Sequence, residues 1–418
     1  MNQARPLLIF LLLILTSLSA IAQQASFPIE RIEVRGARFA SEEVVSRESL
    51  IVEGTTYTEA QLRAAMSRIN RLPFVLDSTF ALEKGTTHGS YVLVVTIVET
   101  KPLFIEAISA RQRQGGSSYP VDGFRTGLRL FVGSSSLIHA ATDFDGNYQA
   151  GLTQYNLFGR PGYVSLGVRW TEDDRVSFQS DRPVPSLFEF RADPSPELRF
   201  GFPVFGDHSI VGSWQHDSGS VRVTTETESR YQKGGSDRGE LAWVFDTTDD
   251  PLLPTSGTLW RSSLNLDVYR SKLQGTYVPG ESHSTSLSFF SGWERHVPLN
   301  GWVSVNYGLG AGIGRFERES EGRPVFGGTG LPGRSESAVD TLGYSASAGL
   351  SSSLWSDRLT RKYGDLRFQA EAEYFGTNEN SDEVVVYGSD RATLELAIVQ
   401  RNVWGTLRLA FNYDRVID

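Results

Sequence analysis

The side chains that could carry out chemistry are few and dispersed in this sequence. It has no cysteine, which removes thiolate metal sites, disulfides and cysteine nucleophiles together. It contains no Gly-x-Ser-x-Gly elbow, glycine-rich phosphate loop or His-Glu-x-x-His motif. We therefore expect no catalytic residue, no cofactor and no metal site. The six histidines are not spaced as metal ligands would be. They are His88, His139, His208, His216, His283 and His296.

One acidic cluster, at residues 246–250, has oxygen ligands of the kind that divalent cations prefer. Aspartates that follow a strand are more often solvated turn formers, and proline and glycine beside them end the strand pairing. We therefore interpret the cluster as part of a turn between two strands. The turn motif consists of Asp246, Asp249, Pro251, Pro254 and Gly257.

The composition favours strands and turns over long helices. Glycine, with 41 residues, exceeds its usual share, and 15 Tyr, 24 Phe and 8 Trp stand beside only 2 Met. The formal net charge is -9 at pH 7. A nucleic-acid binder normally presents a basic face to the phosphates, so we expect no nucleic acid among the partners.

Residues 1–22 have the pattern of a cleaved signal peptide. Arg5 and the amino terminus supply positive charge, Leu7–Leu15 is apolar, and Ala20-Ile21-Ala22 is a small-residue cleavage site. An uncleaved anchor would need roughly twenty apolar residues to span a bilayer, and this run is much shorter. We predict export, with the mature chain beginning after Ala22.

Residues 23–103 are predicted to form a small α+β domain. A strand at Ile29–Val34 is followed by a helix capped by Ser41 and a second helix that begins at Thr58, where Thr58 and Gln61 approximate a capping box. Two strands follow, near 75–82 and 91–98. The predicted order is strand, helix, helix, strand, strand.

Residues 104–418 alternate apolar and polar side chains with a period of two. Tyr163–Trp170 and Leu366–Tyr374 are the clearest examples, each with one apolar face and one charged or small face. The segments are about ten residues long and often carry Tyr or Trp at an end. A secreted sandwich would alternate too, but it rarely needs so many strands. We predict a mainly β protein: a transmembrane antiparallel β-barrel with a polar lumen, preceded by the small domain.

Two turns give the sequence a family resemblance. Asn156–Gly162 and Asp246–Gly257 resemble the turns of the BamA/TamA superfamily of outer-membrane assembly proteins, and residues 23–103 are similar to its POTRA domain. The resemblance covers almost the whole mature chain. It implies about 16 strands in a barrel at residues 104–418.

A long loop near residue 330 resembles the family loop that folds into the lumen. There an Arg at the loop tip pairs with a carboxylate on a neighbouring strand, whereas this chain has Pro332 at the Arg position and Tyr374 at the carboxylate position. We hypothesise that Arg334 pairs instead with Glu371 or Glu373, which we expect to face the lumen. The loop motif is Gly327, Gly328, Leu331, Pro332, Gly333 and Arg334.

The last predicted strand, Trp404–Tyr413, resembles the C-terminal recognition signal of outer-membrane barrels, although five residues follow it. Its outward residues are predicted to be Leu407, Leu409, Phe411 and Tyr413.

The resemblance implies a non-enzymatic protein of the bacterial outer membrane, with residues 23–103 in the periplasm. Its partners would be unfolded outer-membrane or secreted client proteins, periplasmic accessory proteins and the lipid bilayer. Client capture by the POTRA-like domain and lateral opening between the first and last barrel strands would insert a client. Two alternatives are a translocation pore for one secreted protein, as in two-partner secretion, and a passive or structural pore.

Overall fold

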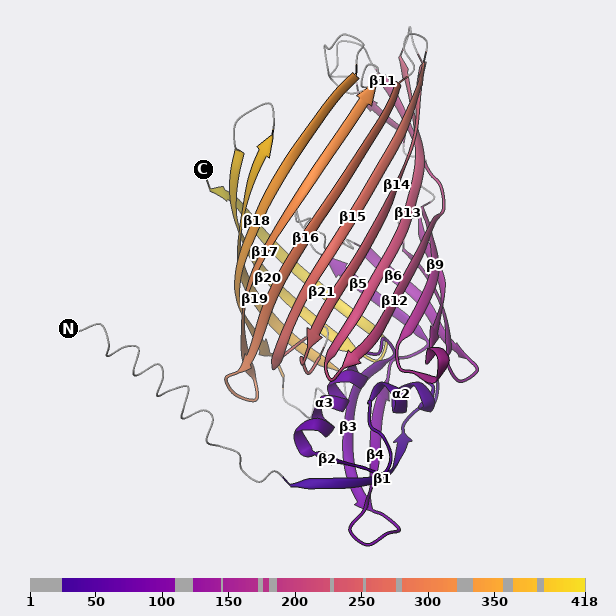
Figure 1. Ribbon diagram of the computed structural model, residues 1–418, viewed down its shortest axis with the longest axis vertical. Helices are drawn as coiled ribbons and strands as arrows, with labels where there is room; N and C mark the ends of the chain where they lie inside the picture. Colours follow the sequence, from indigo (N-terminus) through magenta and orange to yellow (C-terminus); the bar gives the residue numbers. More distant parts are fainter. Residues whose placement is uncertain are drawn as a thin grey trace, which may run out of the picture.

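The computed structural model describes residues 25–109, 123–143, 146–171, 176–179, 186–225, 229–250, 253–275, 280–321, 334–355, 364–381 and 387–417. The predicted signal peptide and loop residues 327–333 lie outside these ranges. Two sheets are present: a small mixed sheet at the N-terminal end and a large barrel (Figure 1).

The small sheet and its two helices form one unit, called the module below. Its strands have the order β2-β1-β4-β3, in which β1 and β4 are parallel and the other pairs antiparallel. The elements are β1 (Ser26–Arg35), α2 (Glu42–Glu48), β2 (Thr55–Thr58), α3 (Glu59–Asn70), β3 (Val75–Lys84) and β4 (Tyr91–Glu99).

Both predicted helix starts are confirmed. The Ser41 hydroxyl accepts a hydrogen bond from the Val44 amide at 3.2 Å, and Thr58 and Gln61 form a complete capping box. The short strand β2, which pairs with the start of β1, was not predicted. Four residues are too few to show an alternating pattern in the sequence.

The large sheet closes on itself into a barrel. Two positions in the barrel are each filled by two short strands in succession. β11 and β12 share one position because both pair with β13, and β9 and β10 share the next because β9 pairs with β12 and β10 with β11. The predicted mainly β, antiparallel barrel is therefore confirmed. Its strands are β5 (Leu103–Ser109), β6 (Gly123–Val132), β7 (Ser136–Asp143), β8 (Asn147–Tyr155), β9 (Tyr163–Thr171), β10 (Val176–Gln179), β11 (Ser186–Ala192), β12 (Ser195–Phe205), β13 (His208–Thr225), β14 (Ser229–Asp246), β15 (Gly257–Gly275), β16 (Gly280–Pro298), β17 (Val303–Glu321), β18 (Arg334–Ser353), β19 (Asp365–Ser381), β20 (Tyr387–Asn402) and β21 (Gly405–Ile417), with a 3-10 turn, η1 (Leu157–Gly159), after β8.

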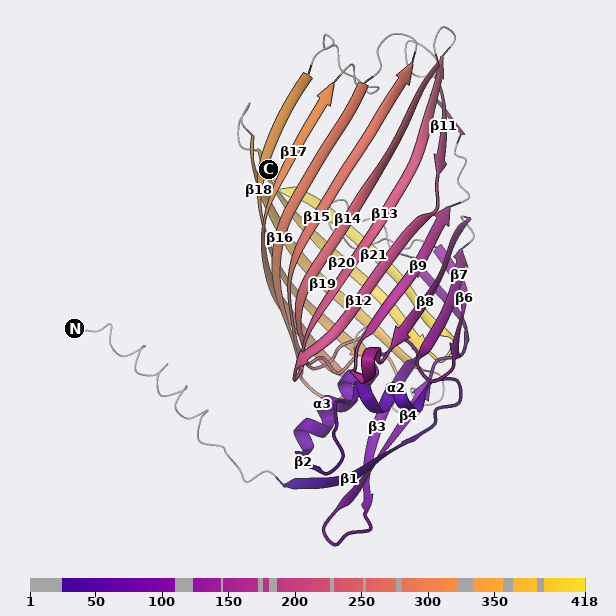
Figure 2. The same cartoon turned by 45° about the vertical axis from the view of Figure 1, so that its right-hand side comes forward.

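The strands differ greatly in length around the barrel. Strands β13–β18, called the long wall, have 18 to 20 residues, whereas β5–β9, called the short-strand side, have 7 to 10 (Figure 2). The prediction of segments about ten residues long is wrong for the long wall. Beyond the apolar band its strands alternate polar with polar residues, which leaves no hydrophobic period to detect.

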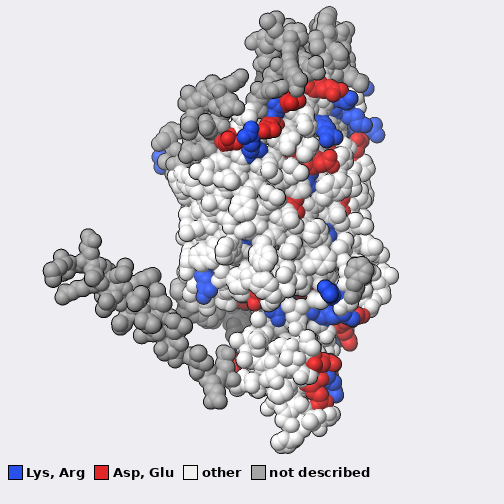
Figure 3. Space-filling model, in the orientation of Figure 1, with Lys and Arg blue, Asp and Glu red and all other residues white. Residues whose placement is uncertain are grey.

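The outer face carries a continuous apolar band. On β17 the outward side chains of Tyr307, Leu309 and Ile313 are exposed, and charged Arg315 and Glu317 follow on the same face. Figure 3 shows this uncharged zone between charged groups at the upper rim and near the module. Among the described residues, no helix is both long and apolar enough to cross a membrane.

Candidate functional site at the barrel mouth and seam

The module lies against one mouth of the barrel, called here the module-side mouth, and the opposite opening is the far rim (Figures 1 and 2). Helices α2 and α3 face the turns that connect the barrel strands. Turn residues from several strand pairs therefore meet one small surface of the module.

Toward the long wall, the module makes charged contacts from α3 and the residue after it. Arg68 Nη1 lies 2.7 Å from Asp207 Oδ1, just before β13, with both side chains largely buried. Arg71 Nε lies 3.1 Å from Asp246 Oδ2, at the end of β14. The Asn70 amide donates to the Asp249 carbonyl at 3.3 Å. These contacts hold α3 against two turns of the long wall.

Toward the short-strand side, the contact is mainly apolar. The Phe74 ring packs edge-on against Phe131 of β6 and Tyr155 of β8, with ring centroids 4.9 and 6.1 Å apart. The module's core of Val44, Leu62, Ile69, Leu93 and Val95 is continuous with these residues. Two hydrogen bonds support the junction: Ser41 donates to the Ser134 carbonyl and Arg47 to the Gly159 carbonyl. The module and this side of the barrel thus share one hydrophobic core.

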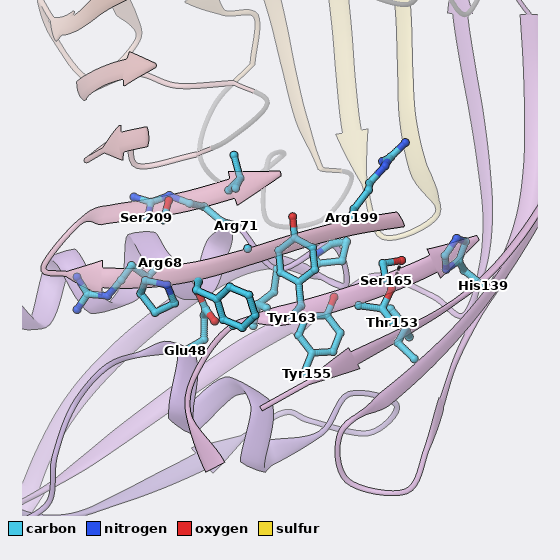
Figure 4. Close-up of a pocket in the computed structure, with 18 of the residues that line it drawn as sticks. Glu48, Arg68, Arg71, His139, Thr153, Tyr155, Tyr163, Ser165, Arg199 and Ser209 are labelled. Carbon is cyan, nitrogen blue, oxygen red and sulfur yellow. Dashed lines mark hydrogen bonds between the residues drawn. The ribbon is translucent and has the colours of Figure 1, made fainter. Parts of the chain in front are cut away.

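A cavity of about 530 Å³ lies between the two contacts (Figure 4). Glu48, Arg68 and Arg71 line it from the module, and residues inside the barrel line it from above. Figure 4 shows Tyr155 and Tyr163 side by side in this cavity. The barrel residues labelled there are His139, Thr153, Tyr155, Tyr163, Ser165, Arg199 and Ser209. The cavity therefore joins the mouth to the lumen.

Burial sets the protonation balance at this junction. It raises the pKa of the Glu48 carboxyl, although the Arg71 and Arg68 charges act in the opposite direction. Burial also lowers the pKa of Arg71, and the Asp246 carboxylate opposes that change. Burial therefore weakens Glu48 as an acid and Arg71 as a base within the same cluster.

The predicted turn motif lies in the connection between β14 and β15, of which residues 247–250 and 253–256 are described. The Asp249 carboxylate accepts hydrogen bonds from the Thr255 and Ser256 amides at 2.8 and 3.1 Å. Gly257 has a φ of +109°, and a Cβ there would lie 2.3 Å from the Thr247 carbonyl oxygen. Asp249 thus links the two ends of the ten-residue connection between β14 and β15.

The same loop also reaches across the mouth. Asp250 forms an ion pair with Arg401 at the end of β20, and Arg401 donates to the Val75 carbonyl of the module at 3.2 Å. Pro254 belongs to the described part of the loop, and Pro251 lies outside it. The described residues contain no cluster of three His, Asp or Glu side chains suited to a metal ion.

The structure does not bring Arg334 together with Glu371 or Glu373. Arg334 is the first residue of β18, at the far rim, and is paired with Glu321. Glu373 lies opposite Ser347, thirteen residues further along β18, which corresponds to about 44 Å of strand. Glu371 lies further still, opposite Gly349 and Glu395. The other loop-motif residues are outside the described part of the chain.

The predicted outward residues of the last strand do lie together on the outer face of β21. Their exposed fractions are 40% for Leu407, 65% for Leu409, 62% for Phe411 and 57% for Tyr413. The strand continues to Ile417, past the predicted end at Tyr413.

β21 closes the barrel by pairing with β5, and this closing pair is called the seam. It is parallel, and its register covers only residues 407–409 against 107–109. Two backbone bonds extend it at the mouth: the Lys101 amide to the Val403 carbonyl at 2.6 Å, and the Ile105 amide to the Trp404 carbonyl at 2.7 Å. Neighbouring strands of the long wall pair along nearly their full lengths.

Sequence reasoning missed the arginines that hold the module. A signal was present for Arg68, which follows Ala65 by three residues and therefore falls on the buried stripe of α3 beside Ile69. A charged residue on an apolar stripe needs a partner, which here is Asp207. No local signal marks Arg401, because its partners are distant in sequence.

The fold and site define a class: a β-barrel with an α+β module on one mouth and a short closing seam. No family model matches the sequence, and no curated protein matches it. Among solved structures, the chain is similar to BamA from Haemophilus ducreyi lacking POTRA domains 1–3, with 12% identity and a TM-score of 0.40 over 94% of this chain and 81% of that one. It is also similar to CdiB from Acinetobacter baumannii, with 9% identity and a TM-score of 0.40 over 93% and 74%. These likenesses do not by themselves assign the chain to a family.

Proposed function

We propose that this chain is a protein of the bacterial outer membrane that helps unfolded client proteins to fold into that membrane. In this proposal residues 1–22 are a signal peptide, residues 23–103 are a POTRA-like domain in the periplasm, and residues 104–418 form the barrel. The two turn motifs that resemble the BamA/TamA superfamily support it. The proposed function involves no enzyme activity and no cofactor.

The apolar band supports a position in a bilayer. On β17 it runs from Val303 to Ile313, about 35 Å of strand, which spans about 27 Å when tilted near 40°. Outer-membrane barrels carry an apolar band of about 25 Å between aromatic girdles. Trp243, Trp260, Trp302 and Trp404 are exposed at the module-side end, as such a girdle would be.

The short seam is the observation that carries the proposal. An unpaired strand edge exposes backbone N–H and C=O groups, which an incoming strand can pair with. Opening the seam breaks far fewer backbone bonds than opening any pair in the long wall. In the proposed mechanism the seam parts, a client strand adds to the free edge, and burial in lipid drives the client forward.

A disulfide across the seam tests this proposal cleanly, because the chain has no cysteine of its own. Ala107 and Leu407 are register partners and would be replaced as A107C/L407C. Paired strands bring Cα atoms within the range that a disulfide needs. The matched control is L309C/A346C, the same residue types at a paired position of the long wall.

The purified full chain would be reconstituted in liposomes and given an unfolded barrel protein as client. We expect oxidation of the seam pair to slow client folding more than tenfold, reductant to restore it, and the control pair to have no effect. Full activity of the oxidised seam variant would exclude lateral opening as the mechanism.

A translocation pore for one secreted protein is the second candidate, and the lumen favours it. Arg238 lies 3.3 Å from Asp267 and 4.0 Å from Asp217, and Arg169 lies 3.7 Å from Asp217, all on the face opposite the apolar band. A charged, wet lumen suits an unfolded chain in transit. Depletion distinguishes the candidates: loss of many outer-membrane barrels supports assembly, loss of one exported protein supports secretion, and loss of neither supports a passive pore.

A further inference from the structure

A group of basic side chains lies on the outer face of the long wall, just beyond the apolar band. We call it the basic patch, and its members come from three neighbouring strands. They are Arg222 of β13, Lys233 of β14, and Arg270 and Lys272 of β15. All four are exposed, and Figure 3 shows Lys and Arg, with Asp and Glu among them, near this upper rim.

Strand register brings these cations close together. Lys233 and Lys272 are direct cross-strand partners, and Arg270 is two residues from Lys272 on the same face. Arg222 is opposite Tyr231, which places it diagonal to Lys233. Like charges at directly opposed positions destabilise a sheet, so such an arrangement calls for an anion between them.

The two carboxylates near the basic patch, Glu281 and Asp237, already have partners and do not neutralise its four cations. Glu281 pairs with Lys272, Oε1 to Nζ, at 2.7 Å. Asp237 lies 2.9 Å from His216 Nδ1. Within the described part of the chain, Lys233 and Arg270 have no ion-pair partner. The patch therefore keeps an excess of positive charge on its outer side.

The height of the patch matches lipid headgroups. The apolar band on β15 ends with Leu264, Leu266 and Val268, and Arg270 follows two residues later, about 7 Å along the strand. With strands tilted near 40°, this is about 5 Å above the hydrocarbon, and the headgroup zone is roughly 5 to 8 Å thick.

We propose that the basic patch binds the phosphate groups of anionic membrane lipids in the leaflet around the far rim. The inference goes beyond client handling and rests only on the bilayer position given under the proposed function. Lipid acyl chains would lie on the apolar band while the phosphate lies between Lys233, Arg270 and Lys272. The charge of the site and its continuity with the band both select a lipid over a soluble anion.

The long wall also provides a matched control. Arg315 of β17 is an outward cation just beyond the same band, but it lies 2.7 Å from Glu317 and 4.0 Å from Asp340. R270Q and R315Q thus remove the same charge from the same zone, the first from a side chain without an ion pair among the described residues and the second from a side chain with two. K233Q/R270Q/K272Q removes the centre of the patch.

The test is native mass spectrometry of the full chain in detergent micelles doped with phosphatidic acid or with zwitterionic phosphatidylcholine. We expect the wild type to retain phosphatidic acid preferentially, with about a fivefold loss per charge removed in R270Q and in the triple variant, and no change in R315Q. A heat-modifiability gel confirms that each variant is folded, and R270Q alone decides the question if the triple variant does not fold.

Three results would overturn the proposal. One is equal retention of the two lipids by the wild type. Another is an equal loss in R315Q and R270Q, since this would mean that any rim cation contributes. The third is displacement of the lipid by millimolar inorganic phosphate, which would make the patch a site for soluble phosphate.

Discussion

The module is attached to the two sides of the barrel by different kinds of contact. On the short-strand side Phe74 shares a hydrophobic core with Phe131 and Tyr155, whereas on the long wall Arg68 and Arg71 pair with aspartates. Apolar contacts tolerate little separation, because burial of area is their whole contribution. Ion pairs are directional and can be exchanged for other polar partners. The module is thus fixed on one side and held by replaceable contacts on the other.

The strands show the same contrast. Long-wall neighbours pair over 17 to 19 residues, but β5 has 7 residues and joins β21 over a short parallel register. The half of the barrel with the shorter strands is therefore the half that shares a hydrophobic core with the module. We infer that the module compensates for the short pairing on that side. The predictions below compare the two attachments, and the last one concerns a part of the module that touches neither.

The largest effect is expected from F74A. Removing the ring at the centre of the shared core should cost about 3–5 kcal/mol in the free energy of unfolding for the module–barrel junction. Hydrogen exchange measured by mass spectrometry should rise in β4 and in β6–β8 but not in β14–β17. The control F39A removes an exposed ring of the same module and should stay near wild type.

R68A is expected to have a smaller effect, about 2–3 kcal/mol, because it leaves Asp207 partly buried without its partner. Exchange should rise in α3 while β6–β8 remain protected, the reverse pattern to F74A. The control R63A breaks an exposed pair with Glu59 on the same helix and should cost at most about 0.5 kcal/mol. Increased exchange in β6–β8 of R68A would remove the distinction between the two attachments.

Glu48 should make the charged attachment pH-dependent. Its pKa is raised in the folded state, so folding favours the protonated form, and stability gained in acid is lost as the pH rises from the unfolded value of 4.5 through the folded pKa. E48Q should therefore protect α3 from protease more than wild type at pH 7, and the two should converge in acid. The same difference at every pH would contradict this role.

The smallest effect is expected at Glu30, far from the barrel. Hydrogen bonds from Ser90, Thr86 and Thr87 lower its pKa from 4.5 to about 2. Its contribution is therefore present above the unfolded value and lost as the pH falls from about 4.5 to about 2. NMR titration of its carboxyl should give a midpoint near 2, and E30Q should loosen the β3–β4 turn without changing α3 exchange. A midpoint near 4.5 would show that these hydrogen bonds are absent in solution.

Much of the architecture was predictable because it depends on local pattern. Period-two alternation identified β9 and β19, and the caps at Ser41 and Thr58 identified both helices. The strand extensions past Arg315 and the parallel direction of the seam have no local signature. They follow from how the whole sheet closes.

The site was less predictable, because its contacts join residues far apart in the chain. Asp246 and Asp249 were singled out as turn residues, but their links to Arg71 and Asn70 depend on how the module lies against the mouth. The hypothesis for Arg334 failed to bring its partners together for a similar reason. It relied on a family loop position, whereas strand register separates Arg334 from Glu373 by much of the barrel's height.

The unequal strand lengths also shape the outer opening. Over the described strands, the long wall extends well past the level at which β6–β9 end (Figure 2). The far rim is therefore oblique to the barrel axis. Along the described strands, the interior of the barrel therefore opens sideways above the ends of β6–β9 as well as toward the far rim.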